Sequence, residues 1–283
     1  MLGLVLEGGA MRAIYVAGVL DVFMENNIWP DGLIGVSAGA IHGSVYLGNQ
    51  PGRTIRYYKK YCKHRNFMSF WSLLTTGSIV GEQFCYHDLP DRLDPFDYDT
   101  FKSCGIPYYA VCTDLETGEA LYQRCTDLRT EMDYMRASAS MPYVSRIVEV
   151  DGKKLLDGGV ADSIPLEAFR RMGYDRNIVV LTQCKNYEKK PQNPKIARLF
   201  YKKYPRFAHA IAQRHQNYNR SLRRVEELEA AGEVFVLRPS ADLGIKRMEK
   251  DPARLEAQYD LGRRDAEAAL TELKNWIEKG KQP

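Results

Sequence analysis

Several marks of a membrane, secreted or metal-binding protein are missing from this 283-residue sequence. No run of 18 apolar residues occurs, so no segment is long enough to cross a bilayer as a helix. The apolar N-terminus has no basic stretch and is soon interrupted by Glu7, which argues against a secretory signal. The six cysteines include no CxxC pair. We therefore expect a cytoplasmic protein with reduced thiols and without a structural zinc site.

Fingerprints of nucleotide and calcium binding are missing as well. The dinucleotide-binding fingerprint GxGxxG is not met, because Ala10 and Ala13 stand at positions where it needs glycine. The sequence also contains no phosphate-binding loop of the form GxxxxGK[ST]. No acidic calcium loop of the EF-hand kind is visible. A net charge of only +4 gives no reason to infer nucleic-acid binding. We expect no metal, no organic cofactor and no nucleic-acid partner.

The sequence does show the alternation of strands and helices that is typical of an α/β fold. Hydrophobic residues make up 45% of the chain and charged residues 27%, which is typical of a globular protein. Short apolar runs that suit buried parallel strands alternate with helical periodicity from the first residues onward. We expect strands at 2–6, 32–36, 107–113, 119–123, 145–150, 153–156, 177–183 and 233–237, and helices at 13–26, 38–47, 54–65, 165–172 and 252–279. We also expect one long basic helical segment from the end of the linker at 194 to about 231.

The segment 185–194, rich in lysine and proline, predicts a linker. It divides the chain into a core at 1–184 and a mainly helical extension at 185–283. We expect the extension to pack on the same domain and to contribute one further strand.

A Gly-Val-Ser-Ala-Gly sequence lies where the second expected strand meets its helix, with Ser37 between Gly35 and Gly39. A serine on such a sharp turn projects its hydroxyl from the strand end, and the flanking glycines relieve crowding. This placement favours a nucleophilic serine. The alternative is an ordinary glycine-rich turn in which Ser37 caps the helix.

Gly8, Gly9 and Ala10 stand between the first expected strand and its helix. Consecutive glycines there leave backbone N–H groups free to face an anion, reinforced by the helix N-terminus. Beside a nucleophilic serine such groups can form an oxyanion hole, and loss of one donor typically costs about 10²–10³ in rate.

A nucleophilic serine needs a base, and none of the five histidines is well placed. His42 follows Ser37 on the same helix, where it cannot easily turn back. The others lie in polar or basic stretches and are expected to be solvated or structural: His64, His87, His209 and His215. A carboxylate is therefore the candidate base.

Asp157 ends an expected hairpin strand and is followed by Gly158 and Gly159. It could accept the serine proton directly if burial and its neighbours raise its proton affinity. The alternative is an ordinary Asp-Gly turn.

Taken together, these motifs resemble the patatin-like phospholipase family. The resemblance rests on Gly8–Arg12 after the first strand, Gly-x-Ser-x-Gly after the second, and Asp-Gly-Gly about 120 residues later. It runs from about Leu2 to Cys184 and includes the segments 114–118 and 138–142.

The resemblance implies a Ser–Asp dyad on a three-layer α/β/α fold with a mainly parallel sheet. Ser37 would then be the nucleophile and Asp157 the general base. The backbone of Gly8, Gly9 and Ala10 would form the oxyanion hole, with Arg12 near it and support from Gly35, Gly39, Gly158 and Gly159. The family's first motif is usually richer in glycine; Ala10 still offers its N–H but limits the backbone angles.

The function implied is a serine acyl hydrolase, a carboxylic-ester hydrolase that cleaves fatty-acyl esters of lipids through an acyl-enzyme. Two alternatives stay open. One is an acyltransferase that uses the same dyad, and the other is a lipid-binding or regulatory protein that kept the fold without turnover.

Two further segments bear on membrane contact. Residues 67–74 form a dense apolar cluster, which either caps the serine or packs into the core. Between Lys195 and Glu226 there are nine Lys/Arg and one acid, interleaved with apolar residues. This stretch suits peripheral contact with an anionic bilayer, but it equally suits a solvated helical face or a polyanion site.

Overall fold

The computed structural model describes residues 1–280 and gathers eight strands of that range into one sheet. The strand order is β5-β6-β3-β2-β1-β7-β8, with β4 paired to β3. The run β3-β2-β1-β7-β8 is parallel, and the other pairings are antiparallel. The strands are β1 Leu2–Leu6, β2 Gly32–Val36, β3 Tyr108–Asp114, β4 Ala120–Cys125, β5 Val148–Val150, β6 Lys153–Asp157, β7 Arg176–Val180 and β8 Val234–Leu237. The expected mainly parallel α/β fold is confirmed.

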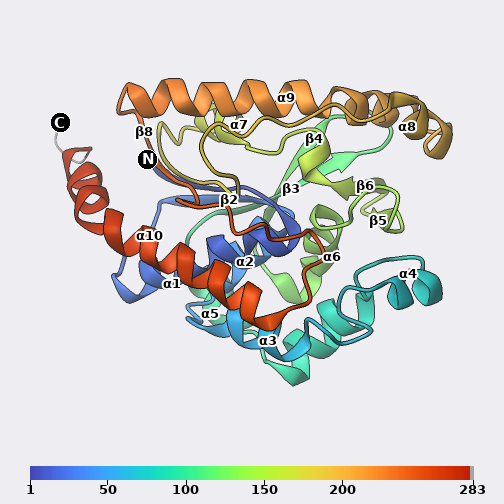
Figure 1. The fold of residues 1–283 in the computed structure, drawn as a ribbon, viewed down its shortest axis with the longest axis horizontal. Coiled ribbons are helices and arrows are strands. Elements are labelled where there is room, and N and C mark those ends of the chain that lie inside the picture. Colours follow the sequence, from blue (N-terminus) through green and yellow to red (C-terminus); the bar gives the residue numbers. More distant parts are fainter. Residues whose placement is uncertain (281–283) are drawn as a thin grey trace.

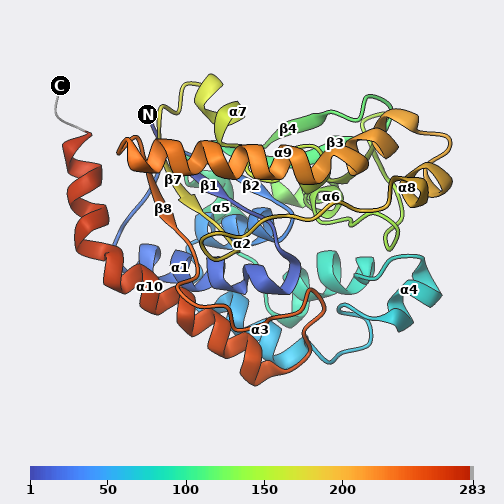
Figure 2. The same ribbon diagram turned by 45° about the horizontal axis from the view of Figure 1, so that its top comes forward.

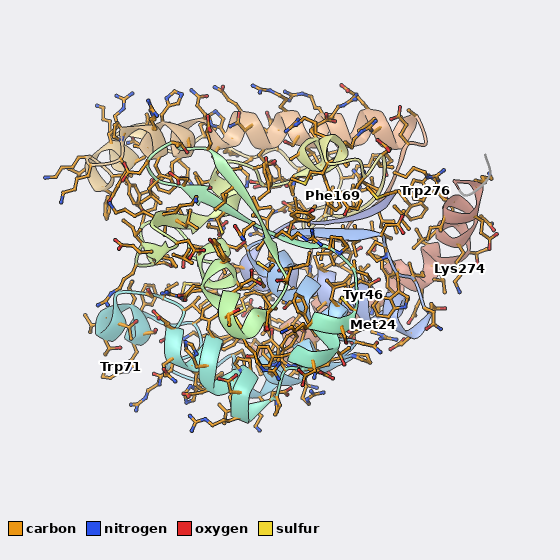
Figure 3. All side chains as sticks on the ribbon, turned by 180° about the vertical axis from the view of Figure 1, so that it is seen from behind. Met24, Tyr46, Trp71, Phe169, Lys274 and Trp276 are labelled. Carbon is orange, nitrogen blue, oxygen red and sulfur yellow. The ribbon has the colours of Figure 1, made fainter. Side chains whose placement is uncertain are left out.

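Helices cover both faces of the sheet (Figure 1). Along β1 the side chains alternate, so that Leu4 and Leu6 pack with α1, α2 and α6 while Val5 packs with α7 and α9. The helices are α1 Ile14–Glu25, α2 Ala38–Leu47, α3 Arg53–Tyr61, α4 Phe70–Thr76, α5 Tyr98–Ser103, α6 Leu128–Ser138, α7 Leu166–Arg171, α8 Pro194–Phe200, α9 Pro205–Ala230 and α10 Pro252–Lys279. In the view from behind, Phe169 and Tyr46 mark the two faces (Figure 3).

Three helical segments were not expected from the sequence: α5, α6 and a π-helix at Phe84–Leu93. Helix α5 has only six residues, too few to show a helical periodicity in the sequence. Pro90 lies inside the π-helix, and a proline within a segment normally argues against a helix there. The basic stretch after residue 194 also divides into two helices, because the chain turns at 201–204 before Pro205 begins α9.

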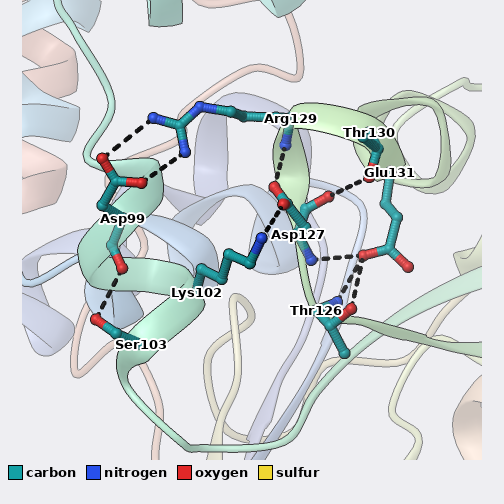
Figure 4. A network of polar contacts seen from close by, with 8 residues as sticks. All are labelled: Asp99, Lys102, Ser103, Thr126, Asp127, Arg129, Thr130 and Glu131. Atoms are coloured by element: carbon teal, nitrogen blue, oxygen red, sulfur yellow. Dashed lines mark hydrogen bonds and ion pairs between the residues drawn. The ribbon is translucent and has the colours of Figure 1, made fainter.

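Polar contacts fix where α6 begins (Figure 4). Asp127 accepts a hydrogen bond from the N–H of Arg129 at 3.0 Å, and Glu131 accepts from the N–H of Asp127 at 2.7 Å. The Asp127 side chain thus caps the helix N-terminus, and Glu131 satisfies the N–H of the capping residue. Ion pairs from Arg129 to Asp99 (2.8 Å) and from Lys102 to Asp127 (2.7 Å) attach the same turn to α5. The far end of α6 carries Ser138, which contacts the turn at Ser37 between β2 and α2.

Residues 185–280 are part of the same layered structure. β8 extends the sheet beside β7, and α10 lies along α1 in both ribbon views (Figures 1 and 2). The two helices approach closely where each has a glycine. A Cβ added to Gly18 would lie 2.1 Å from the backbone carbonyl oxygen of Tyr259, and one added to Gly262 would lie 2.1 Å from the backbone carbonyl oxygen of Tyr15. The division of the chain at residue 184 stays a prediction.

Candidate active site

Ser37 occupies a strained turn between β2 and α2. Its φ of 55° and ψ of −126° are unusual for a residue with a side chain and are typical of a nucleophile held at a strand–helix turn. Its side chain makes no capping hydrogen bond to α2, so the ordinary helix-cap alternative does not describe it. Instead, the hydroxyl donates to Oδ2 of Asp157 at 3.0 Å.

The neighbouring strand and α6 hold this turn in place. The Ser37 N–H donates to Oγ of Ser138 at 2.9 Å, and that hydroxyl donates to the carbonyl of Val111 at 2.6 Å. Ser138 is fully buried. It lies in one of the segments that carried the family resemblance, but sequence reasoning gave it no role, since nothing local shows that its hydroxyl reaches a turn 101 residues away.

Asp157 is held at the end of β6 so that each carboxylate oxygen has its own partner. Oδ1 accepts the N–H of Gly159 at 2.7 Å, and Oδ2 faces Ser37. Its N–H donates to the Ser140 carbonyl at 2.9 Å, and its carbonyl accepts from Thr113 at 2.9 Å. The carboxylate therefore caps its own turn and also contacts the serine.

Burial sets the electrostatics of this pair. Only 5% of Asp157 and 7% of Ser37 is exposed to solvent. Burial raises the pKa of the Asp157 carboxyl above its ordinary value, and the Arg214 guanidinium is the strongest influence in the opposite direction. A carboxylate with a raised pKa is a better proton acceptor near neutral pH than an exposed one.

The loop of Gly8, Gly9 and Ala10 lies against the serine turn. A Cβ added to Gly8 would lie 2.8 Å from the Ser37 Cβ. No acceptor within residues 1–280 receives the N–H groups of these three residues. Ala10 takes a φ of 49°, in the left-handed region that glycine adopts more easily. The departure from a glycine-rich motif is thus tolerated at the cost of local strain.

Residues from distant parts of the chain fix this loop. Glu7 accepts hydrogen bonds from the Tyr218 hydroxyl at 2.8 Å and the Thr182 N–H at 2.6 Å. The Met11 N–H donates to the carbonyl of Arg247 at 3.4 Å. Sequence reasoning missed these contacts because Tyr218 and Arg247 lie far along the chain in segments without a recognisable motif.

The supporting glycines lie where no side chain would fit. A Cβ on Gly39 would lie 2.6 Å from the Glu7 oxygen, one on Gly35 would lie 2.6 Å from the Ala40 Cα, and one on Gly158 would lie 2.1 Å from the Val111 oxygen. A side chain at any of these three positions would collide with neighbouring backbone. These close approaches bring the first loop, the serine turn and the Asp157 turn together.

Two cavities meet at Ser37, and Ala10, Ser37 and Met141 line both. The first contains about 930 Å³ of empty space, part of it open to solvent, and its lining is mainly apolar, including Tyr58 and Met132. The second contains about 1140 Å³, and we call it the polar cavity because several charged residues, Glu7 and Arg214 among them, join apolar ones in its lining. Both Ser37 and Asp157 line the second cavity.

Comparison with known proteins agrees with this arrangement. A family model described as "Patatin-like phospholipase" matches residues 4–170. The chain belongs to the patatin-like phospholipase family. This membership supports a lipid hydrolase function in broad terms. A second model, for a domain of unknown function named DUF6363, matches residues 204–278.

Relatives of this patatin-like chain come from bacteria and animals. The uncharacterized protein YjjU of Escherichia coli is 31% identical over 64% of this chain and 52% of its own length. An uncharacterized NTE family protein of Mycobacterium tuberculosis is 26% identical over 62% of this chain and 48% of its own length. Neuropathy target esterase sws of Drosophila melanogaster is 26% identical over 61% of this chain and 12% of its own length. The matched region thus spans about half of the two bacterial relatives, and less of the fly protein.

The histidines of this patatin-like chain make no contact with the Ser37–Asp157 hydrogen bond within the described residues. His42 is buried on α2, its ring nitrogens have no hydrogen-bond partner within residues 1–280, and burial lowers its pKa to about 3. His64, His87 and His209 are exposed, and His215 is half-buried.

The apolar cluster at 67–74 is divided between buried and exposed positions. Phe67 is buried, and Phe67 and Met68 line the apolar cavity. On α4 the side chains of Phe70, Trp71 and Leu74 are 72%, 51% and 82% exposed. Trp71 points away from the body of the molecule in the rear view (Figure 3). The segment is therefore partly a cavity wall and partly an exposed apolar surface.

Proposed function

We propose that this protein is a serine acyl hydrolase that cleaves fatty-acyl esters with a Ser37–Asp157 dyad. The observation that carries the proposal is the 3.0 Å hydrogen bond from the Ser37 hydroxyl to Oδ2 of Asp157. It lies where an apolar cavity meets a loop with unoccupied N–H donors. A single site thus offers a nucleophile, a base, an oxyanion position and room for an acyl chain.

In the proposed reaction Asp157 accepts the Ser37 proton while Oγ attacks the ester carbonyl carbon. The N–H groups of Gly8, Gly9 and Ala10 stabilise the resulting oxyanion. The intermediate collapses to an acyl-enzyme, and Asp157 returns the proton to the departing alkoxide. Water then attacks the acyl-enzyme with Asp157 again as base, which releases the fatty acid and restores the serine. The sequence of steps uses only groups of this chain and requires no cofactor.

Labelling with a fluorophosphonate, measured by intact mass, tests this proposal. We expect one adduct on the wild type, none on Ser37→Ala and slow formation on Asp157→Asn. Ser44→Ala is a matched control, because Ser44 lines the apolar cavity but its hydroxyl donates to the Ile41 carbonyl. A well-folded wild type that forms no adduct would contradict the proposal and favour the lipid-binding alternative.

We also propose that the protein is cytoplasmic and contacts anionic membranes with one end of the molecule. The six cysteines are free thiols, which suits a reducing compartment. No helix within residues 1–280 has the length and hydropathy to cross a bilayer. Exposed apolar side chains gather on α4 and also on α8, where Ile196, Leu199 and Phe200 are 48%, 74% and 61% exposed.

The two helices α4 and α8 flank the loop of Tyr143 and Val144, which borders the polar cavity. On one side, Ile79, just after α4, donates its N–H to the Val144 carbonyl at 2.7 Å. On the other side, Phe200 of α8 packs edge-on against Tyr143, with ring centroids 5.2 Å apart. Tyr143 and Val144 line the polar cavity. Both views place α4 and α8 at the same end of the molecule (Figures 1 and 2).

Flotation with anionic vesicles tests the membrane proposal. We expect binding that weakens with salt and with charge reversal at Lys202, Lys203 and Arg206, which follow or adjoin α8. Charge reversal at Lys274 and Lys279, at the far end of α10, is the control and should leave binding unchanged. Vesicle binding that is insensitive both to salt and to charge reversal at Lys202, Lys203 and Arg206 would refute the membrane proposal.

A further inference from the structure

The apolar cavity runs along α2 from the serine to a buried end. Ser37 directly precedes the helix, and Ile41 and Val45 of the helix line the cavity. Phe96 lines it as well and lies at the other end of α2, because its Cε2 atom is 3.0 Å from the position of a Cβ added to Gly48. The ten residues of α2 span about 15 Å. The cavity therefore extends from the serine hydroxyl over about the length of this helix.

A buried arginine lies at this far end. Arg53 of α3 lines the cavity and is only 4% exposed. Its guanidinium carbon is 5.5 Å from the ring centroid of Phe96 and 5.4 Å from that of Tyr57. The guanidinium group donates to the backbone carbonyls of Asp94 and Pro95 through Nη2 and Nε. The mainly apolar cavity thus ends beside a positive charge.

The charge of Arg53 is only partly balanced. Within residues 1–280 its one carboxylate neighbour is Asp94, whose Oδ1 lies 3.4 Å from Nε. Arg56 contacts the same carboxylate more closely, with Nε 2.7 Å from Oδ2 and Nη2 2.8 Å from Oδ1. Two guanidinium groups therefore share one negative charge. Burial lowers the pKa of Arg53, and the Asp94 charge does not fully offset this effect.

One nitrogen of Arg53 is also left without an acceptor. The hydrogen bonds of its side chain within the described residues use Nε and Nη2, so both N–H groups of Nη1 remain unused. A buried cation with free donors is more stable when an anion joins it. The far end of the cavity is therefore suited to a negatively charged group.

We propose that Arg53 binds a carboxylate at the far end of the acyl chain, so that the substrate is a half-ester of a long dicarboxylic acid. The ester then lies at Ser37, the methylene chain lies along α2, and the terminal carboxylate contacts the guanidinium group. This inference rests on the proposed hydrolase function, because it specifies the acyl group of that reaction.

Length and charge both suit such a chain. A fully extended chain advances about 1.2 Å per bond, so an acyl group of about twelve carbons spans the roughly 15 Å of α2. A carboxylate can accept two parallel hydrogen bonds from one guanidinium group. A carboxylate without such a partner is strongly unfavourable in an apolar cavity. A cavity that lacked this contact would therefore reject the charged chain, and the charge of the chain end decides between the two cases.

Matched esters test the proposal: the p-nitrophenyl monoester of dodecanedioic acid and p-nitrophenyl laurate, which has as many carbons but ends in a methyl group. We expect wild type to prefer the half-ester in kcat/KM. Arg53→Gln should lower this preference about tenfold or more, the effect of losing a charge-assisted hydrogen bond. Arg53→Lys should keep part of the preference, because it retains the charge. Lys60→Gln changes an exposed cation of the same helix and is the control that should leave the preference unchanged.

The comparison of the two esters on wild type needs no variant. This matters because Arg53 also holds the carbonyls of Asp94 and Pro95, so Arg53→Gln removes contacts of that loop as well. A wild type that hydrolyses the laurate ester and rejects the half-ester would overturn the proposal and leave the hydrolase function standing.

Calorimetry on Ser37→Ala separates the carboxylate site from the hydrolase function. We expect monomethyl dodecanedioate to bind more tightly than methyl ω-hydroxydodecanoate, with the difference lost in Ser37→Ala/Arg53→Gln. If wild type hydrolyses no ester but this binding pattern is found, the hydrolase function fails and the carboxylate site stands. Equal affinities for the carboxyl-terminated and hydroxyl-terminated esters would overturn the assignment of a carboxylate.

Discussion

The two cavities that meet at Ser37 come from different parts of the chain. The apolar cavity is lined only by residues between Ala10 and Met141. The polar cavity also takes residues from Lys189 to Met248, beyond the region that matches the patatin-like family model. The apolar side of the site thus belongs to the family core, whereas the charged side also depends on the C-terminal part.

This difference teaches that two aspects of specificity can vary independently. Changes in the core should alter which acyl chain is accepted, and changes after residue 184 should alter which head group is accepted. The dyad lies at the junction, so a variant that affects both sides equally would contradict this separation.

The largest effect is expected from filling the apolar cavity. Met132→Trp places a larger ring in the cavity and should lower kcat/KM for long acyl esters at least about tenfold relative to short ones, because lost apolar contact of this size costs about 1–3 kcal/mol. Chain-length profiles measure this. Met172→Trp, a half-buried methionine on the other face of the sheet, should leave the profile unchanged. An unaltered profile in Met132→Trp would place the acyl chain elsewhere.

Removing the hydroxyl that holds the serine turn should cost stability. Ser138→Ala leaves the Ser37 N–H without its acceptor, which costs about 1–3 kcal/mol for a buried donor. Urea unfolding measures this. Ser140→Ala is the control, because that hydroxyl only donates to the Arg136 carbonyl, and it should cost less. Equal losses in the two variants would mean that the Ser37 contact adds no stability.

A smaller effect is expected on the pH dependence. Only the ionised form of Asp157 accepts the serine proton, so activity should fall as the pH drops through its raised pKa. Arg214→Gln removes the strongest influence that lowers this pKa. The acid limb of kcat/KM for a neutral ester should therefore move to higher pH, while Arg223→Gln leaves it in place. A limb that stays fixed in Arg214→Gln would show that Asp157 does not govern it.

The smallest effect is expected at the strained loop. Ala10→Gly relieves a left-handed conformation that costs an alanine about 1–2 kcal/mol, against about 0.4–1 kcal/mol for the greater freedom of glycine in the unfolded chain. We expect a slightly more stable protein in thermal unfolding. Ala13→Gly, at a helical φ of −68°, should be less stable by about 0.5–1 kcal/mol. Destabilisation of both variants would show that Ala10 is not strained.

The sequence predicted elements whose pattern is local. β1, β2 and the helices that follow them lie within a residue or two of their expected positions, because buried parallel strands and amphipathic helices leave a clear periodicity. The segment around α6 gave no such signal, although Asp127 is a favoured helix N-cap residue and could have been recognised as one.

For the site, the motifs predicted that Ser37 and Asp157 would meet, and the structure brings them together. Arg214, Lys189 and Arg247 line the polar cavity, which could not be predicted because it depends on where three separate segments end in space. Nothing in a basic helix distinguishes Arg214, which faces a cavity, from Arg223, which faces solvent.

The packing of α10 along α1 also means that α1 is synthesised well before the helix that covers it. The ribosome releases the serine, the base and the first helix long before it releases Pro252–Lys279, the segment that covers that helix. At about 5–20 residues per second, the last hundred residues take roughly 5–20 s to synthesise. During that interval the nascent chain holds both members of the dyad but lacks the Arg247 contact to the loop at Met11 and the covering of α1. We therefore expect the loop at Met11 and the outer face of α1 to reach their final environment only after Pro252–Lys279 has been synthesised.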